Sequence, residues 1–374
     1  FQFAIWIVGE NLFSILVLQI IVDAINCVVI AFIARFLNKS FFILAGMLSA
    51  FSPLMIIISS QMLSDTIFLF FFSMSILCIL NFTKNKKENF IYLGSLFLSL
   101  ALFTRVVVLP LIFLAPILII YISYREKYNV LKIIRIISIF FILSFSLVTP
   151  RIINNYYNFN SFSLTSQSGS HFAYWVLPAI LDFDSEERKL QYKKKLEELN
   201  KPIELLENPF ESSELLKKEA FNFFIATDKK LILLAWSKGA LINIFGPPFF
   251  IDKRLRSIPH PSFYENDRNL VRWITSIFKN DEFKKYKIML CISIIFSIFF
   301  LLLFSYGIFL IFKGYFQISV IFLIISCYFI VVTGPVFSPK YIHPIMPYLI
   351  VLEVIALKRL FELFVKLFVH AKHN

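Results

Sequence analysis

The sequence predicts an all-α protein that crosses a membrane several times. Of its 374 residues, 58% are hydrophobic and only 16% are charged, which lies outside the balance of water-soluble domains. Long apolar stretches recur along the chain, and a helix needs about 20 apolar residues to span a bilayer. We therefore expect a polytopic transmembrane helix bundle of about nine visible spans, with a helical extracytoplasmic insert before the last three spans.

Apolar runs mark the expected spans. They are residues 13–35, 40–59, 65–82, 90–104, 106–123, 133–150, 288–312, 316–336 and 344–364. The runs 90–104 and 106–123 are short and meet at Thr104 and Arg105, so a helical hairpin that does not fully cross is an alternative to two spans. The four cysteines lie inside apolar runs, which indicates buried core positions rather than disulfides or a zinc site.

The charges predict the orientation in the membrane. The net charge of +13 could indicate a nucleic acid ligand, but membrane proteins collect Lys and Arg on cytoplasmic loops, and we expect no nucleic acid partner. Alternating spans put the cation-rich loops and the C-terminus on the cytoplasmic face and residues 151–287 outside. The Phe, Ile, Lys and Asn bias is typical of an AT-rich genome, so we expect a bacterial inner membrane.

Four regions follow from this pattern. We expect residues 1–12 to be the interfacial tail of an outer loop, and 13–150 to be an N-terminal transmembrane module. Residues 151–287 form the extracytoplasmic and interfacial helical domain, and 288–374 the C-terminal transmembrane helices with a basic cytoplasmic tail. Helical segments are expected at 185–200, 211–228 and 229–250, the last lying at the membrane interface.

Acidic residues at membrane depth are costly and are candidates for function. Asp65, in SSQMLSDTIFLF, could cap the following helix together with Ser64. The alternative is an acid at the mouth of a cavity, which acts as a general base or holds an acceptor or metal ion. Asp23 and Glu353 lie within apolar spans, where we expect them to pair or hydrogen-bond between helices.

Three cations lie at predicted outer ends of helices: Arg105 in LALFTRVVVLPL, Arg151 in TPRIINNYY and Lys340 in SPKYIHPIMPYL. Arg105 must extend to the headgroups, pair with an acid or meet an anionic ligand, and a guanidinium suits phosphate. Pro150 is expected to stop or kink the helix before Arg151. An anionic ligand held at the outer face, such as a polyprenyl-phosphate-linked donor, is the simplest common cause.

The polar run after Arg151 suits a sugar. Asn154, Asn155 and Tyr156 offer neutral donors and acceptors that match sugar hydroxyls. His343 has no partner at metal-ligand spacing, and we predict no metal ligands. No cofactor is predicted with certainty, and the use of a divalent cation stays open.

Five segments, in this order, resemble those of membrane-embedded GT-C glycosyltransferases. They are QIIVDAINCVVIAFIARFL, LSAFSPLMIIISSQMLSDTIFLF, LGSLFLSLALFTRVVVLPL, TPRIINNYYNFNSFSLTSQSG and SPKYIHPIMPYLIVL. The chain is similar to the protein mannosyltransferase and aminoarabinose transferase group, that is, glycosyltransferase family 39, over most of 13–169 and 333–352. The resemblance implies inverting transfer of a hexose or pentose from a polyprenyl-phosphate donor to a glycan, lipid or protein acceptor outside the cytoplasmic face.

The resemblance also implies site residues. Arg105 and Arg151 match basic positions near the donor phosphate, Asp65 matches an acid after the Ser-Pro helix, and Lys340 with Tyr341 matches the basic-aromatic pair before the last helix. The family's first span and acidic outer loop would precede Phe1, so we expect the main catalytic base upstream and the given sequence to be a fragment.

Two other functional classes fit the composition. A flippase or transporter of lipid-linked saccharides would also gather cations near a phosphate, although such proteins often show internal repeats, which are absent from this sequence. A polymerase or ligase of surface polysaccharide is the other alternative. Membrane lipids are expected partners in all three cases.

Overall fold

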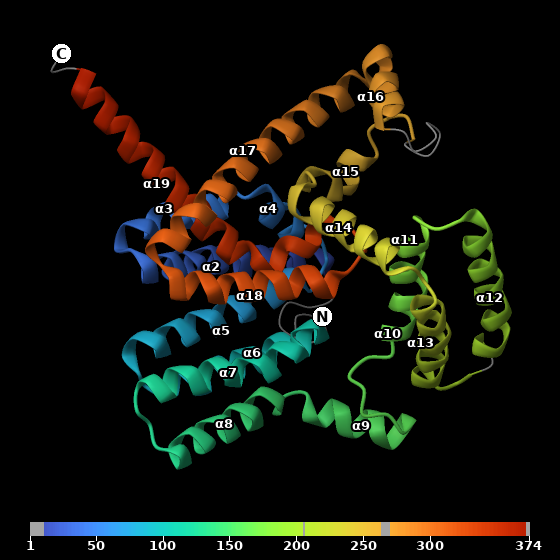
Figure 1. Cartoon of the computed structure of the whole chain (residues 1–374), viewed down its shortest axis with the longest axis horizontal. Coiled ribbons are helices and arrows are strands. Elements are labelled where there is room, and N and C mark those ends of the chain that lie inside the picture. The colour runs from blue at the N-terminus through green and yellow to red at the C-terminus, as the bar shows by residue number, and fades with distance from the viewer. Residues whose placement is uncertain (1–10, 205, 263–269, 372–374) are drawn as a thin grey trace. The chain divides into compact units, whose positions relative to one another are not determined.

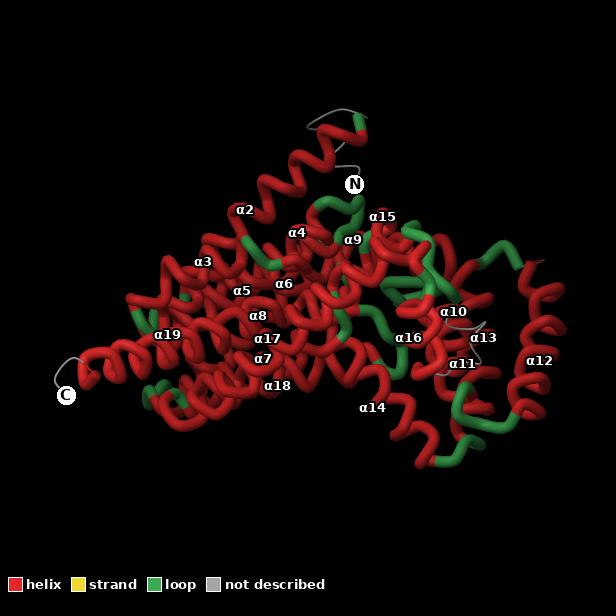
Figure 2. Tube along the Cα trace, turned by 90° about the horizontal axis from the view of Figure 1, so that it is seen from above, coloured by secondary structure: helices red, strands yellow, loops and turns green. Residues whose placement is uncertain are grey.

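The computed structural model describes residues 11–204, 206–262 and 270–371. Figure 2 shows that the regular structure of these residues is helical throughout, with no strand, which confirms the all-α prediction. The predicted interfacial tail, residues 1–12, lies almost wholly outside the described residues. Asn11 caps helix α2 (Leu12–Leu37), because its side chain accepts a hydrogen bond from the backbone N–H of Phe13 at 2.9 Å.

Four helices of the described part are long and apolar enough to cross a membrane. They are α2, α5 (Asp65–Asn85), the segment Val106–Arg125 with α7 (Leu109–Arg125), and the segment Asp281–Gly314 with α17 (Lys284–Gly314). Two bent helix pairs raise the number to six if each pair is one span. Helix α6 (Asn89–Thr104) and the segment Ser319–Thr333 of α18 (Phe316–Thr333) are apolar but shorter. The count of nine spans stays a prediction.

Both bent pairs break just before a proline. Helices α3 (Phe42–Ala50) and α4 (Pro53–Ser59) meet at 54°, and α8 (Val130–Phe145) and α9 (Thr149–Phe159) meet at 58°. A proline fits the first turn of a helix, since no intrahelical N–H donor is needed there. The predicted interruption at Pro150 is therefore present as a bend, but Pro150 does not end α8: α8 ends at Phe145, and Pro150 lies in the first turn of α9.

One compact unit contains the described residues of 64–240 and 328–337, and we call it unit 1. In its apolar part, α6 packs against α5 and α8, and α7 packs against α8 (Figure 1). The end of α18 also belongs to this unit. Its Tyr328 hydroxyl donates to the carbonyl of Val107, and its Phe329 ring lies edge-on to Phe72 with centroids 5.5 Å apart.

Two loops of unit 1 are joined by ion pairs. Lys86 and Glu126 link the loop after α5 to the loop after α7 at 2.9 Å, and Glu88 of the first loop pairs with Lys132 at 3.1 Å and Arg135 at 2.8 Å at the start of α8. Both loops were expected on the same face from their charge. The ion pairs place them side by side, as antiparallel apolar helices require.

The segments of the insert that were predicted to be helical are helical. They form α12 (Glu186–Glu204), α13 (Pro209–Ile225) and α14 (Lys229–Phe245), preceded by α10 (Ser168–His171), a π-helical turn Phe172–Val176 and α11 (Leu177–Leu181). Their shared core includes Leu177, Ile180 and Leu216. At Gly169 a Cβ would lie 1.7 Å from the Ser213 carbonyl oxygen, so only glycine lets α10 approach α13 this closely. The extracytoplasmic position of these helices stays a prediction.

The second compact unit, unit 2, contains the described residues of 11–63, 241–327 and 338–371. Helix α2 packs against α3, and α17 packs against α19 (Met346–Ala371). Its shorter elements are η4 (Pro248–Ile251), α15 (Lys253–Arg256), α16 (Leu270–Lys279) and η6 (Pro339–Ile345).

The cysteines divide into two pairs by exposure. Cys27 and Cys78 are buried as predicted, whereas Cys291 and Cys327 are exposed, so the prediction of buried cysteines is wrong for the second pair. The outer side of an apolar helix accepts a small thiol as readily as a core does, because lipid and core are both apolar.

Candidate functional site

Asp65 and Arg105 form an ion pair within unit 1. Asp65 is the first residue of α5, and Arg105 follows the end of α6, where its backbone is extended. Nη1 of Arg105 donates to Oδ1 of Asp65 at 2.5 Å. Of the three predicted roles of Arg105, pairing with an acid is the one that the structure contains. The two residues are 40 positions apart in the sequence.

The two partners differ in exposure. The Asp65 side chain is 3% exposed and that of Arg105 is 29% exposed. The guanidinium carbon also lies 6.0 Å from the centroid of the buried Phe68 ring, one turn along α5. A guanidinium has five N–H donors. Since a part of this side chain is exposed, donors beyond the one bound to Asp65 can reach an anion.

Asp65 lies where a carboxylate is stabilised. The N-terminus of a helix carries partial positive charge from its free N–H groups. Ser64 occupies the N-cap position but makes no side-chain capping hydrogen bond, and the Asp65 carboxylate is directed to Arg105. The main contact of Asp65 is therefore its ion pair with Arg105, and not a capping hydrogen bond at the start of α5.

The predicted sugar contacts after Arg151 lie on helix α9 instead of in a loop. Arg151 and Asn154 are exposed, and Asn154 accepts a hydrogen bond from the Asn158 side chain at 3.0 Å. Asn155 is buried, and its amide donates to the carbonyl of Ser163 at 2.8 Å, which fixes the chain after α9. The ring of Tyr156 stacks on Phe162 with centroids 4.5 Å apart.

Lys340 and Tyr341 lie in η6 of unit 2. The ammonium of Lys340 lies 5.3 Å from the centroid of the Tyr341 ring. Regular α-helix is interrupted here, because Pro339 and Pro344 belong to a 3₁₀ segment before α19. Arg105 and Arg151 belong to unit 1 and Lys340 to unit 2, and of these three cations Arg105 is the one that the structure pairs with another predicted site residue of opposite charge, Asp65.

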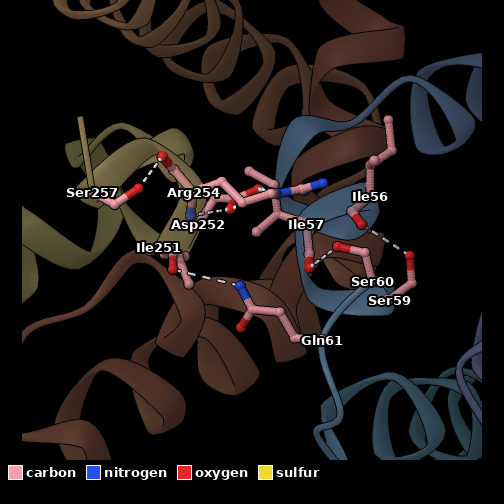
Figure 3. A network of polar contacts seen from close by, with 9 residues as sticks. All are labelled: Ile56, Ile57, Ser59, Ser60, Gln61, Ile251, Asp252, Arg254 and Ser257. Carbon is pink, nitrogen blue, oxygen red and sulfur yellow. Dashed lines mark hydrogen bonds and ion pairs between the residues drawn. The ribbon is translucent and has the colours of Figure 1, made fainter. Parts of the chain in front are cut away.

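A second charged pair was missed by the sequence analysis. Asp252 is buried at the start of α15. Its carboxylate accepts a hydrogen bond from the backbone N–H of Arg254 at 2.8 Å and another from the Arg254 guanidinium at 2.6 Å (Figure 3). The hydrogen bond from the Arg254 side chain holds the pKa of Asp252 below its ordinary value. The signal that could have found this pair is an acid followed by three cations within five residues, directly after an apolar run.

An apolar groove lies beside this pair. It has a volume of about 390 Å³ and is lined by Asp252 and Arg254 together with apolar residues of unit 2. Those residues are Phe51, Pro53, Ile56, Ile57, Phe249, Leu255 and Met289. Figure 3 also shows the amide of Gln61 directed to the carbonyl of Ile251, 3.5 Å away, which links the end of α4 to η4.

Two acids lie buried within the predicted spans. Asp23 of α2 is buried, its Oδ1 accepts no hydrogen bond from the described residues, and the Ser59 hydroxyl of α4 donates to the carbonyl of Ile56 instead, so the predicted bond between helices is not formed. Glu353 of α19 is also buried, and it forms no hydrogen bond or ion pair with any described residue. Within the described part of the chain, no group of three or more His, Cys, Asp or Glu side chains could hold a metal ion.

The comparison with known families bears on the part of the chain that holds the Asp65–Arg105 pair. Residues 1–153 match the dolichyl-phosphate-mannose-protein mannosyltransferase family. The resemblance predicted from the sequence is thereby confirmed for this part of the chain. No curated protein and no solved structure matched the chain.

The match to the mannosyltransferase family separates the candidate residues. Asp65, Arg105 and Arg151 lie within the matched residues. The helical insert and the whole of α19 lie outside them, as do Lys340 and Glu353. Among the candidate residues, the mannosyltransferase resemblance therefore bears directly on Asp65, Arg105 and Arg151 only.

Proposed function

We propose that this protein transfers a sugar from a polyprenyl-phosphate donor to a glycan, lipid or protein acceptor on the extracytoplasmic face of a membrane. The Asp65–Arg105 pair within the mannosyltransferase-like module carries the proposal. A partly exposed guanidinium, held in place by a buried carboxylate, is a suitable group to bind a phosphate.

The proposed reaction has one bond made and one broken. The oxygen of an acceptor hydroxyl attacks the anomeric carbon, while the bond from that carbon to the phosphate oxygen breaks and the configuration inverts. The acceptor proton passes to a carboxylate base, and the phosphate leaves with increased negative charge. Arg105 stabilises this charge, and a fixed donor aimed at a developing charge is among the largest contributions to catalysis.

Asp65 fits the role of a positioning residue in this reaction. Its Oδ1 already accepts a hydrogen bond from Arg105, and its side chain is almost fully buried. A buried carboxylate in an ion pair is poorly placed to meet an acceptor hydroxyl. Asp65 then acts through Arg105, and its predicted role as general base is the alternative within the same proposal.

The other residues predicted from the sequence are separate candidates. Arg151 and Lys340 are further candidates for the donor phosphate, and Asn154, Tyr156 and Tyr341 for sugar or acceptor contacts. Asn155 fits this role less well, since its amide donates to Ser163.

The proposed topology has nine spans, with the insert outside and the C-terminus in the cytoplasm. The paired loops around Glu88 support a cytoplasmic side for the ends of α5 and α7, because both loops are rich in Lys and Arg. Arg105 lies at the opposite end of α6 from Glu88, on the outer face in this topology.

Arg105→Lys tests the proposal with the charge retained. In proteoliposomes that contain the full-length protein and polyprenyl-phosphate sugars, we expect transfer to an acceptor to fall on the order of 100-fold, as for loss of one preorganised donor. Arg135→Lys is the matched control, because Arg135 also pairs with an acidic residue of unit 1, Glu88, but is 60% exposed. Equal activity of the two variants would remove Arg105 from the site.

The same assay separates the rival class. A flippase would move intact lipid-linked sugar across the vesicle membrane without attaching the sugar to an acceptor. Lipid movement without transfer would replace the transferase proposal by the flippase.

A further inference from the structure

A pocket of about 100 Å³ lies within unit 2, and we call it the Glu353 pocket. It is bounded by the α3–α4 junction, the chain around η4, the middle of α17 and the start of α19. Glu353 is the one acidic side chain among its described lining residues, which include no Lys, Arg or His. Phenylalanines dominate the wall: Phe245, Phe249, Phe296, Phe300 and Phe304.

Glu353 has no compensating partner in the described part of the chain. It is 7% exposed, and no described residue donates a hydrogen bond to it or pairs with it. The other polar residues of the wall are Ser52, Asn243 and Ser297, and the Asn243 side-chain oxygen already accepts from the backbone N–H of Ser338 at 2.7 Å. A carboxylate removed from water without a partner is strongly unfavourable, so Glu353 either holds a proton or binds a cation from outside the chain.

We propose that the Glu353 pocket binds an ammonium group. A cation supplies the charge that the carboxylate lacks, and its N–H groups supply the missing hydrogen bonds. Aromatic rings attract cations through their π electrons, and a carboxylate combined with aromatic walls is typical of sites for organic ammonium ions. The volume is several times the roughly 10–15 Å³ that one water molecule needs, so it admits a group of several heavy atoms.

The composition of the wall argues against other ligands. An anion would meet the carboxylate without any cation of the wall to offset the repulsion. A sugar would need many polar partners, whereas most lining residues are Phe, Leu, Ile and Pro. The ammonium can come from a lipid headgroup or from a free amine. The inference does not depend on the transferase proposal, because it concerns binding alone.

Binding to the purified full-length protein tests the proposal. With the protein in detergent, the thermal midpoint is measured against ethylammonium chloride or methylammonium chloride, with sodium chloride at equal ionic strength as reference. In nanodiscs, phosphatidylethanolamine is compared with phosphatidylglycerol. We expect a rise in the midpoint with the ammonium salts, with the ethanolamine lipid, or with both.

Variants assign the effect to the pocket. Glu353→Gln keeps the side-chain shape and removes the charge, and we expect it to weaken ammonium binding at least tenfold. Phe300→Leu keeps an apolar wall and removes one ring, and we expect a loss of several-fold. Glu362→Gln is the matched control, because Glu362 lies on the same helix but is exposed and paired with Arg359 at 3.2 Å.

Each outcome decides the proposal. A response to free ammonium supports a site for a small amine, and a response to the ethanolamine lipid alone supports a lipid headgroup. The proposal is overturned if wild-type protein responds to neither probe, or if Glu353→Gln responds as wild type does. If wild-type protein binds ammonium but shows no transferase activity, then the proposed function fails and the ammonium proposal stands.

Discussion

Asp65 of unit 1 and Glu353 of unit 2 are both buried acids on apolar helices, but their charges are balanced in different ways. Asp65 lies at a helix N-terminus, and Arg105 binds it at 2.5 Å. Glu353 lies seven residues inside α19 and has no partner among the described residues. Removing a carboxylate from water costs several kcal/mol unless a cation or hydrogen-bond donor compensates for the lost hydration. Unit 1 therefore balances its buried acid internally, whereas unit 2 leaves one to be balanced from outside.

The largest effect is expected from removal of the internal partner. Arg105→Ala leaves the Asp65 carboxylate buried and unpaired, and such a loss costs about 3–5 kcal/mol. Because Arg105 is 29% exposed, we expect the lower end of this range, about 3 kcal/mol. Denaturant unfolding of the full-length protein in micelles measures it.

A double variant separates pairing from packing. Arg105→Leu combined with Asp65→Asn removes both charges, and most of the lost stability should return, since a buried pair is often replaceable by uncharged groups. If the double variant is as unstable as Arg105→Ala, then the stability lost in Arg105→Ala does not come from an unpaired Asp65 carboxylate.

The next effect comes from the close contact of α17 with α19 beside Glu353. A Cβ at Gly307 would lie 2.3 Å from the Leu352 carbonyl oxygen, so Gly307→Ala must separate the two helices. We expect a loss of about 1–3 kcal/mol, as for overpacked cores, together with loss of ammonium binding at the Glu353 pocket. Gly314→Ala is the control, because that position faces open space. Similar stability of both variants would show that the helix contact is loose.

A substitution of Glu353 itself is expected to raise the stability of the protein instead of lowering it. Glu353→Leu removes an unpartnered buried carboxylate, and we expect stabilisation by about 1 kcal/mol in the absence of amines. Asp65→Leu should instead destabilise the protein, because it leaves Arg105 without its carboxylate. Thermal unfolding of the two variants checks the sign, and destabilisation by both would mean that Glu353 has a partner of its own.

The smallest effect is expected at the exposed network around Glu88. Burial raises the pKa of Glu88, but hydrogen bonds from Tyr92, Lys132 and Arg135 outweigh it and hold the pKa below its ordinary value of 4.5. The network therefore contributes stability above the unfolded-state pKa, and this contribution is lost as the pH falls through the lower folded-state pKa. We expect less than about 1 kcal/mol, as for surface ion pairs. Thermal midpoints of wild type and Glu88→Gln should converge at acidic pH and differ at neutral pH.

Single residues of the candidate site could be predicted from the sequence, but their contacts could not. Arg105 stood out because a lone guanidinium between apolar helices needs a reason, and Asp65 because an acid begins an apolar run. Their pairing joins the start of α5 to the residue that follows α6, 40 positions apart, and no local sequence pattern predicts it. Pro150 was correctly expected to interrupt a helix, but it lies in the first turn of α9 instead of ending α8.

The sequence by itself determined that this chain is helical and belongs in a membrane. In lipid every backbone N–H and C=O must be bonded within its own segment, so long apolar runs become helices whatever they contact. The tertiary structure alone decided which buried acid has a cation and which faces a pocket. That choice depends on where side chains of distant helices meet, as Gly307 meets Leu352 one residue before Glu353. The apolar composition of the long helices does not predict such contacts, because apolar residues lie on all of their faces.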